Sequence, residues 1–246
     1  MRKLGVIPAR YSSTRLPGKP LEQIGGKSMI QRVFERSLHA FNADELYIAT
    51  DDERIFNHVK TFTQNVLMTS DQHTNGTERV AEVVSILNFE GVVINIQGDE
   101  PFIDPIAVTQ VINAFSNSST EIASLYRKCE NMNEIESDSV IKVVIDYHGN
   151  ALYFSRAPIP YYRDVQQEKI YYRHVGLYGF TSDVLTKLVR LPVSDLERAE
   201  SLEQLRWLEN GFRIKMTETH HQSESVDTQQ DLTRIRNNWA LGMYEN

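Results

Sequence analysis

Short apolar runs alternate with amphipathic stretches through the first half of the chain, and this alternation most limits the folds open to it. The amphipathic stretches carry apolar residues at helical spacing, such as Met29, Val33 and Phe34. Strands that alternate with helices form βαβ units around a mostly parallel sheet. Strands are expected at residues 4–8, 46–49, 66–68 and 92–96, and helices near 29–38, 55–62 and 79–87. We predict an α/β fold with a Rossmann-like sheet that binds ligands at the carboxyl ends of its strands.

The second half of the chain has a different pattern. Gly149-Asn150 and a proline-containing segment separate apolar runs there, which indicates a mixed or antiparallel, strand-rich addition to the sheet. Strands are expected at residues 140–145, 151–155, 172–180 and 212–216, and helices at 196–208 and 229–241. We predict a single domain over residues 1–246, with an inserted lobe around residues 140–195.

Composition excludes several classes of protein. The 246-residue chain has a formal net charge of −7, whereas a nucleic-acid-binding protein normally shows a basic face. Cys129 is the only cysteine, so an intramolecular disulfide is impossible and a cysteine-based zinc site is disfavoured. No stretch approaches the roughly 20 apolar residues that a membrane helix needs. The N-terminal apolar run is too short for a signal peptide. We expect a cytoplasmic protein without membrane insertion or a nucleic-acid partner.

Three cations, Arg10, Arg15 and Lys19, follow the first predicted strand within ten residues. A loop after such a strand is a common phosphate site. Arginine offers a forked set of N–H donors, and lysine offers a compact positive charge. Such side chains, separated by small hydroxyl residues, suit an anion with several charges close together, such as a triphosphate. The alternative is a solvated basic loop.

Two common nucleotide motifs are absent from the sequence. No Gly-x-Gly-x-x-Gly follows a predicted strand. Gly26-Lys27-Ser28 resembles the end of a P-loop, but Leu21 stands where the leading glycine is required. A P-loop ATPase and a typical dinucleotide oxidoreductase are therefore disfavoured.

Acidic residues lie beside several expected strands and helices. Asp99, in Gln97-Gly98-Asp99-Glu100-Pro101, follows the fourth strand, where a carboxylate can hold magnesium beside a nucleotide. A turn or a helix cap is the alternative there. Asp51-Asp52 also follows a strand, and we expect it to cap the next helix. Asp227 suits a cap of the last helix or a second metal ligand, and its position alone favours the cap.

Arg156 and His174 are candidates for gripping the carboxylate and hydroxyls of a sugar acid. Glu203-Gln204 lies on a predicted helix that would close the same pocket. The alternative is a surface arginine and a core histidine.

The chain resembles the 3-deoxy-manno-octulosonate cytidylyltransferases, or CMP-Kdo synthetases, in a series of ordered blocks. The first block, Ile-Pro-Ala-Arg-Tyr-Ser-Ser-Thr-Arg-Leu-Pro-Gly-Lys-Pro-Leu at residues 7–21, resembles the nucleotide signature of that family. Further matching blocks lie at residues 49–52, 68–70, 76–79, 95–101, 143–144, 151–160, 173–178, 202–206 and 226–232. The resemblance thus spans nearly the whole chain.

The resemblance implies a nucleotidyltransferase-type α/β fold and a homodimer, with the inserted lobe serving sugar binding and dimerisation. It also implies magnesium-dependent transfer of CMP from CTP to the anomeric hydroxyl of Kdo, with release of pyrophosphate. This reaction would supply the inner sugar of lipopolysaccharide.

Site residues follow from the resemblance position by position. It places the triphosphate on Arg10, Arg15 and Lys19, which act in catalysis together with the magnesium ligands Asp99 and Asp227. It places the rest of the nucleotide on Pro8, Ala9, Ser70, Asn75, Gly76, Thr77 and Gln97. It places the sugar on Gln97, Arg156, His174, Tyr178, Glu203 and Gln204. Two positions depart from the family pattern: Asn75 stands where serine is common, and Ser225 where glycine often precedes Val-Asp-Thr.

Three other functions compete with this prediction. The same reaction on 8-amino-Kdo or a sialic acid is the nearest. A metal-dependent glycosyltransferase would use Asp51-Asp52 or Asp99-Glu100 on its metal. A nucleotide sensor would bind CTP without turnover.

Overall fold

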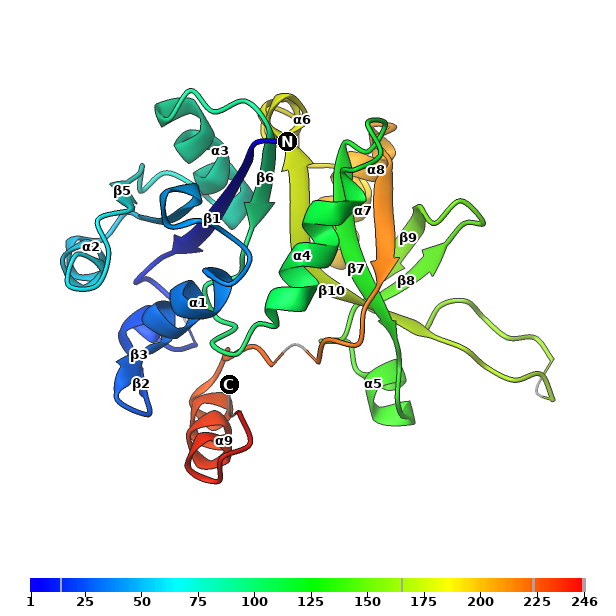
Figure 1. The fold of residues 1–246 in the computed structure, drawn as a ribbon. Helices are drawn as coiled ribbons and strands as arrows, with labels where there is room; N and C mark the ends of the chain where they lie inside the picture. Colours follow the sequence, from blue (N-terminus) through cyan, green and yellow to red (C-terminus); the bar gives the residue numbers. More distant parts are fainter. Residues whose placement is uncertain (14, 165, 223, 245–246) are drawn as a thin grey trace. The chain divides into compact units, whose positions relative to one another are not determined.

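The computed structural model describes residues 1–13, 15–164, 166–222 and 224–244. The chain forms two compact units (Figure 1). The first contains Met1–Thr109 and His221–Asn246, and the second contains Gln110–His220. Helix α4 (Pro105–Ala114) includes the boundary between them.

The first unit is built on four parallel strands in the order β6–β1–β4–β5. Continuous apolar runs form these strands because both faces of the sheet are covered. Val6, Ile7, Ile48 and Ile94 are fully buried. The bounds are β1 Lys3–Ala9, β4 Leu46–Thr50, β5 Val66–Met68 and β6 Val92–Asn95. All four predicted strands of the first half are confirmed.

Side-chain caps set where the helices of this unit begin. Ser28, Asp52, Asn75 and Thr228 each accept a hydrogen bond from a backbone N–H in the first turn of the helix that follows. The helices are α1 Met29–Ser37, α2 Glu53–Val59, α3 Gly76–Ile86 and α9 Gln229–Ala240, with short 3-10 helices η1 Lys19–Leu21 and η2 Ala43–Glu45. The expected helices are confirmed, and the cap by Asp52 is as predicted.

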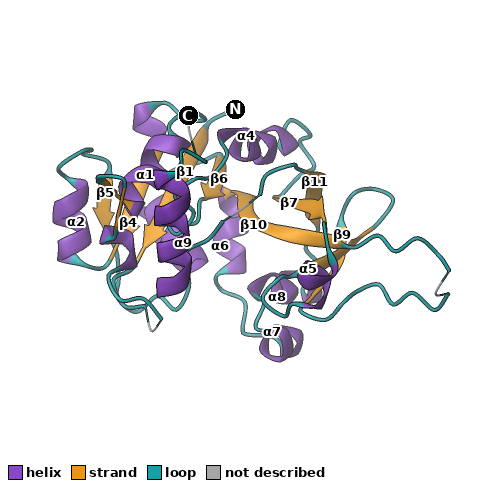
Figure 2. Ribbon diagram, turned by 90° about the horizontal axis from the view of Figure 1, so that it is seen from below, coloured by secondary structure: helices purple, strands orange, loops and turns teal. Residues whose placement is uncertain are grey.

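The P-loop-like Gly26-Lys27-Ser28 lies in a hairpin of β2 (Gln23–Ile24) and β3 (Lys27–Ser28). Ile24 of this hairpin packs with Met29 of α1 and with Leu232 and Ile235 of α9. Figure 2 shows α9 beside α1. The segment is therefore part of a hydrophobic core and does not form a P-loop.

The second unit has a mixed sheet centred on β7 (Ile122–Lys128). Strand β10 (Tyr172–Thr181) runs antiparallel to β7, and β11 (Ile214–Glu218) runs parallel to it. Strand β8 (Lys142–Ile145) pairs with both β10 and β9 (Ala151–Ser155). The predicted mixed, strand-rich character is confirmed.

One predicted helix of this unit is wrong. The continuous helix expected at 196–208 is broken into α7 (Asp195–Glu200) and α8 (Glu203–Glu209). Ser201 adopts the left-handed conformation, with φ 53° and ψ 49°. Because the helix breaks here, the Leu202 side chain is buried. The free energy gained by burying this side chain offsets the roughly 1–2 kcal/mol cost of the left-handed conformation. Two further helices, α5 (Met132–Glu136) and α6 (Ser182–Leu188), complete the unit.

The arrangement as a single domain with an inserted lobe around residues 140–195 stays a prediction. No helix within the described ranges combines the length and apolar character needed to cross a bilayer.

Candidate functional site

A pocket of about 440 Å³ opens in the first unit at the carboxyl ends of β1 and β6. Loops from four regions of the sequence form it: those after β1, β5 and β6, and the segment before α9. It is lined by Pro8, Ala9, Arg10, Ser12, Ser13, Arg15, Lys19, Pro20, His73, Thr74, Asn75, Gly76, Arg79, Gln97, Gly98, Asp99 and Asp227. The pocket thus brings together all three cations of the first loop and both predicted metal ligands.

The loop after β1 folds back on itself. The carbonyl oxygen of Tyr11 accepts hydrogen bonds from the backbone N–H of Ser13 and of Gly18, at 2.9 and 3.0 Å. Gly18 has a φ of +72°, a conformation that glycine adopts readily. The turn carries the chain into η1, where Lys19 is the first residue. Arg10 is exposed and Arg15 keeps 63% of its side-chain surface exposed, so both can reach an anion in the pocket.

Lys19 lies between Asp99 and Asp227. Its Nζ is 2.8 Å from Oδ2 of Asp99 and 3.3 Å from Oδ1 of Asp227. Arg15 also contacts Oδ1 of Asp227, at 3.1 Å. The two acidic segments are tied together by a backbone hydrogen bond of 2.9 Å from Val226 N–H to the Asp99 carbonyl oxygen. One cationic group therefore already bridges the two carboxylates.

Burial raises the pKa of the Asp99 carboxyl, while the neighbouring Lys19 opposes that rise. Glycine at position 98 is required here by space, because a Cβ would lie 2.7 Å from the Pro8 carbonyl oxygen. The close approach of the loop after β6 to β1 sets the position of Asp99 in the lining of the pocket.

The donor set fits a hard cation. Two carboxylates that share an ammonium group can also share Mg²⁺, which takes its remaining ligands from phosphate and water. The described residues contain no cluster of three or more His, Cys, Asp or Glu side chains suited to hold a metal alone. A magnesium ion here would therefore depend on the nucleotide for part of its coordination, and the ion itself stays a prediction.

The prediction from position alone, that Asp227 caps the last helix, is wrong. Thr228 is the N-cap of α9, and Asp231 completes a capping box by accepting from Thr228 N–H at 3.0 Å. The Asp227 side chain is turned instead toward Lys19 and Arg15. The structure therefore leaves this carboxylate to the pocket.

The other acidic pair is occupied elsewhere. Oδ2 of Asp51 is 2.7 Å from Nη2 of Arg79, whose side chain is only 3% exposed. Asp52 accepts from the backbone N–H of Arg54 at 2.9 Å and caps α2. Neither carboxylate is held ready for a metal.

The loop between β5 and α3 and the first residues of α3 contain several of the predicted nucleotide residues. Oδ1 of Asn75 accepts from Glu78 N–H at 2.9 Å and so caps α3. Asn75 and Gly76 line the pocket, whereas Ser70 and Thr77 are not among its lining residues. Ser70 N–H donates to Glu82 at 2.9 Å. The cap explains why asparagine is accommodated where the family commonly has serine, since both cap well.

His73, Thr74 and Arg79 also line the pocket, and no role was predicted for them from the sequence. Nε2 of His73 is 2.5 Å from Oε2 of Glu82. Arg79 also donates to the Ser70 carbonyl oxygen at 3.2 Å. Their spacing ahead of and within a helix carries no chemical signature, because their partners lie on other elements.

His174 and Tyr178 lie together on β10 in the second unit, with ring centroids 5.2 Å apart. Phe154 and Trp207 pack against them at 5.0 and 5.1 Å. Burial, with the charge of Arg173, lowers the pKa of His174 to about 3. Burial, with the charge of Glu203, raises the pKa of Tyr178 well above its ordinary value. Both side chains are therefore uncharged at neutral pH.

The remaining predicted sugar residues differ in their surroundings. Arg156 donates from Nε to the Glu200 carbonyl oxygen at 2.6 Å and from Nη1 to that of Asp138 at 2.8 Å. Glu203 contacts Nη2 of Arg206 at 3.0 Å, and Gln204 is buried. Backbone carbonyl oxygens thus hold the Arg156 guanidinium through three of its five N–H groups, and its sugar role stays a prediction.

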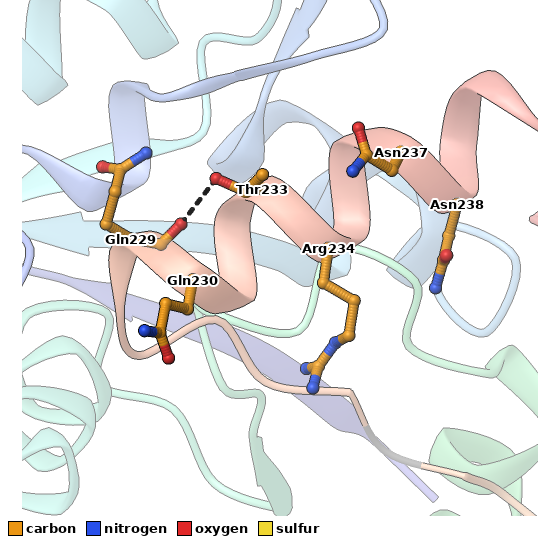
Figure 3. A pocket seen from close by; sticks show the side chains of 6 residues that line it. All are labelled: Gln229, Gln230, Thr233, Arg234, Asn237 and Asn238. Carbon is orange, nitrogen blue, oxygen red and sulfur yellow. Dashed lines mark hydrogen bonds between the residues drawn. The ribbon is translucent and has the colours of Figure 1, made fainter.

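A second pocket lies along one face of α9 (Figure 3). It is lined by Gln229, Gln230, Thr233, Arg234, Asn237 and Asn238, and the Thr233 hydroxyl donates to the Gln229 carbonyl oxygen at 2.9 Å. Five of these six side chains are exposed. A solvated face of one helix has no convergent buried group with which to perform chemistry.

Comparison with known proteins gives a consistent result. The family model described as Cytidylyltransferase matches residues 4–218. A 3-deoxy-manno-octulosonate cytidylyltransferase of Solibacter usitatus (strain Ellin6076) is 49% identical over 233 residues, covering 94% of this chain and 92% of the relative. A protein of the same name from Bacteroides thetaiotaomicron is 46% identical over 241 residues, covering 94% and 96%.

Solved structures agree with the sequence relatives. A CMP:2-keto-3-deoxy-manno-octonic acid synthetase complexed with CTP has a TM-score of 0.93 and 40% identity, covering 98% of this chain and 100% of its own. A putative glucose-1-phosphate thymidylyltransferase of Bacillus anthracis has a TM-score of 0.67 at 17% identity, covering 99% and 96%, and shares the fold. The predicted nucleotidyltransferase-type α/β fold is confirmed.

Proposed function

The chain belongs to the cytidylyltransferase family, and we propose that it transfers CMP from CTP to the eight-carbon sugar acid Kdo, releasing pyrophosphate. The carrying observation is that relatives of this name match nearly the full length of the chain at 49% and 46% identity. The pocket supports the proposal, because it gathers Arg10, Arg15 and Lys19 where a triphosphate is expected. The enzyme is a nucleotidyltransferase.

In the proposed reaction, the anomeric hydroxyl oxygen of the sugar forms a bond to the α-phosphorus of CTP. The bond from that phosphorus to the bridging oxygen breaks, pyrophosphate leaves, and the hydroxyl proton passes to water. Arg10, Arg15 and Lys19 hold the phosphates and stabilise the charge of the leaving group. No covalent enzyme intermediate is needed, so positioning provides most of the rate enhancement.

Magnesium is part of this proposal. Asp99 and Asp227 are the residues that would hold the ion, since both already contact one cationic group. When bound, Mg²⁺ would polarise the reacting phosphoryl group. Lys19 would then be released to bind phosphate.

The remaining contacts follow the sequence predictions. We assign the nucleotide to Pro8, Ala9, Ser70, Asn75, Gly76, Thr77 and Gln97. We assign the sugar to Gln97, Arg156, His174, Tyr178, Glu203 and Gln204. A homodimer, a cytoplasmic location and supply of Kdo for lipopolysaccharide also belong to the proposal. Sedimentation at micromolar concentration tests the dimer, and a mass near that of one chain would count against it.

Pyrophosphate release separates the competing functions. The protein should release pyrophosphate from CTP with free Kdo and less efficiently with 8-amino-Kdo or a sialic acid. Binding of CTP without turnover on any sugar acid would identify a sensor instead. A glycosyltransferase that places its metal on Asp51-Asp52 is disfavoured, because Asp51 pairs with Arg79 and Asp52 caps α2.

A further inference from the structure

Strand β10 bulges where it faces Ser124 of β7. The strand register shifts between Val175, which pairs with Leu125, and Gly179, which pairs with Ala123. Residues 176–178 of β10 therefore lie opposite a single residue of β7, Ser124. The hydroxyl of Ser124, which is fully buried, lies 3.2 Å from the Val175 carbonyl oxygen and 2.9 Å from that of Leu177. Ser124 therefore supplies a hydrogen-bond donor at the irregular part of the strand.

The same hydroxyl determines where the proton of His174 sits. Oγ of Ser124 is 2.9 Å from Nε2 of His174. A hydroxyl has one proton, and carbonyl oxygens only accept, so the proton of Ser124 points to a carbonyl. Nε2 must then carry the hydrogen that His174 donates to Oγ.

The His174 ring holds only that one proton at neutral pH. Burial lowers its pKa to about 3, so the ring is neutral. With the proton on Nε2, Nδ1 is an unprotonated acceptor. Within the described ranges no hydrogen bond to Nδ1 is seen.

Tyr178 places a second polar group beside this ring. Its hydroxyl is buried and makes no hydrogen bond with any described residue. A buried polar group without a partner is destabilising, so a ligand that forms a hydrogen bond with the Tyr178 hydroxyl would remove this destabilisation. An acceptor on His174 and a protonated hydroxyl on Tyr178 suit the hydroxyl groups of a sugar.

We propose that Ser124 is a positioning residue that fixes the Nε2–H tautomer of His174, so that Nδ1 accepts a hydrogen bond from a hydroxyl of the sugar acid. The inference rests on the proposed function for the identity of the sugar. Ser124 acts through His174 and does not itself contact the sugar. No sequence motif identifies Ser124, because the backbone carbonyl groups and the histidine ring that it contacts come together only at the bulge of β10.

Nitrogen-15 NMR of the histidine side chains tests the tautomer directly. In the wild-type protein the His174 signals should show a protonated Nε2 and an unprotonated Nδ1. In Ser124→Ala the acceptor is lost, and the tautomers should become mixed. Ser124→Thr keeps a hydroxyl and should restore the wild-type pattern. A wild-type protein with the proton on Nδ1 overturns the proposal, whether or not Ser124→Ala folds.

Steady-state kinetics tests the consequence for the sugar. Ser124→Ala should raise KM for Kdo roughly two- to tenfold, the range for one hydrogen bond, and leave KM for CTP unchanged. Ser37→Ala is the matched control, since Ser37 is fully buried and its hydroxyl donates to the Val33 carbonyl oxygen at 2.7 Å. The control should change neither the His174 tautomer nor the sugar KM.

The outcomes separate this inference from the proposed function. An active wild-type enzyme whose Ser124→Ala variant keeps both the tautomer and the sugar KM refutes the role of Ser124. A wild-type protein that shows the Nε2–H tautomer but does not use Kdo leaves the role of Ser124 in setting the ring intact and refutes the proposed substrate.

Discussion

Replacing Asp227 by Asn removes one negative charge from the pocket while keeping the shape of the side chain. The structure separates this carboxylate from the helix cap, because Thr228 and Asp231 form the capping box of α9. Asp227 keeps 37% of its side-chain surface exposed, its partner Arg15 is 63% exposed, and Lys19 still has Asp99 as a partner when Asp227 is replaced. An ion pair of this kind contributes about 0–1 kcal/mol, so the variant should remain folded.

Turnover should respond far more strongly than stability. If Asp227 shares the catalytic cation with Asp99, its loss removes a preorganised contact to the developing charge. Contacts of that kind are worth about 10²–10³ in kcat. Pyrophosphate release, measured as a function of Mg²⁺ concentration, should show this loss together with a raised requirement for magnesium.

Thr228→Ala provides the matched control one residue away. Loss of the cap should lower stability by about 1 kcal/mol, which lowers Tm by about 2–4 °C for a protein of this size. The control should keep its kcat. Near-normal kcat with a normal magnesium dependence in Asp227→Asn would refute the shared-cation reasoning.

Three further predictions concern the nucleotide and the sugar residues. CTP should be strongly preferred over ATP, because the family uses a pyrimidine site, and equal turnover with both nucleotides contradicts this. Arg156→Ala should raise KM for Kdo more than KM for CTP, since a charge-assisted contact is worth about 1.5–3 kcal/mol; it should also lower Tm, because Arg156 joins the segment after β9 to Glu200. An unchanged sugar KM in the folded variant rejects the sugar role. His174 remains neutral in the fold down to a pKa of about 3, whereas an unfolded histidine takes up a proton near pH 6.5, so stability should fall as the pH drops below 6.5. Urea unfolding at pH 7 and pH 5 should show a loss of about 2 kcal/mol that disappears in His174→Asn, and an equal loss in both proteins would exclude His174 as the source.

Much of the first unit was predictable from sequence because its strands are continuous runs of large apolar residues. The run Val92–Asn95, for example, predicts a buried strand, and the structure has one there. The segment around α4 and β7 carries a weaker signal. Most residues of α4 are apolar, and one of them, Ile106, is 66% exposed. The apolar residues of α4 therefore do not mark its buried face in the sequence. The break at Ser201 has no glycine to mark it and depends on the tertiary burial of Leu202.

Many residues that line the pocket were predicted from sequence, but the partners of their charged groups were not. Lys19 lies 80 residues from Asp99 and 208 residues from Asp227 along the chain. Sequence spacing carries no information about which charges meet at such separations. The same holds for Ser124 and His174, which are 50 residues apart and meet through a strand register that only the structure defines. Local signals therefore indicated the cations after β1 and Asp99, the resemblance added Asp227 and His174, and the topology of the sheets decided which groups meet.

The fixed loop after β5 has a consequence for the kinetics of nucleotide association. Arg79 joins Asp51 at the end of β4 to the Ser70 carbonyl, and Glu82 receives both Ser70 N–H and the ring of His73. A loop secured in this way before the ligand arrives loses little conformational entropy on binding. Capture of the nucleotide should then proceed in one kinetic phase, with an observed rate constant that rises linearly with the concentration of the partner in excess and no slow step of loop ordering.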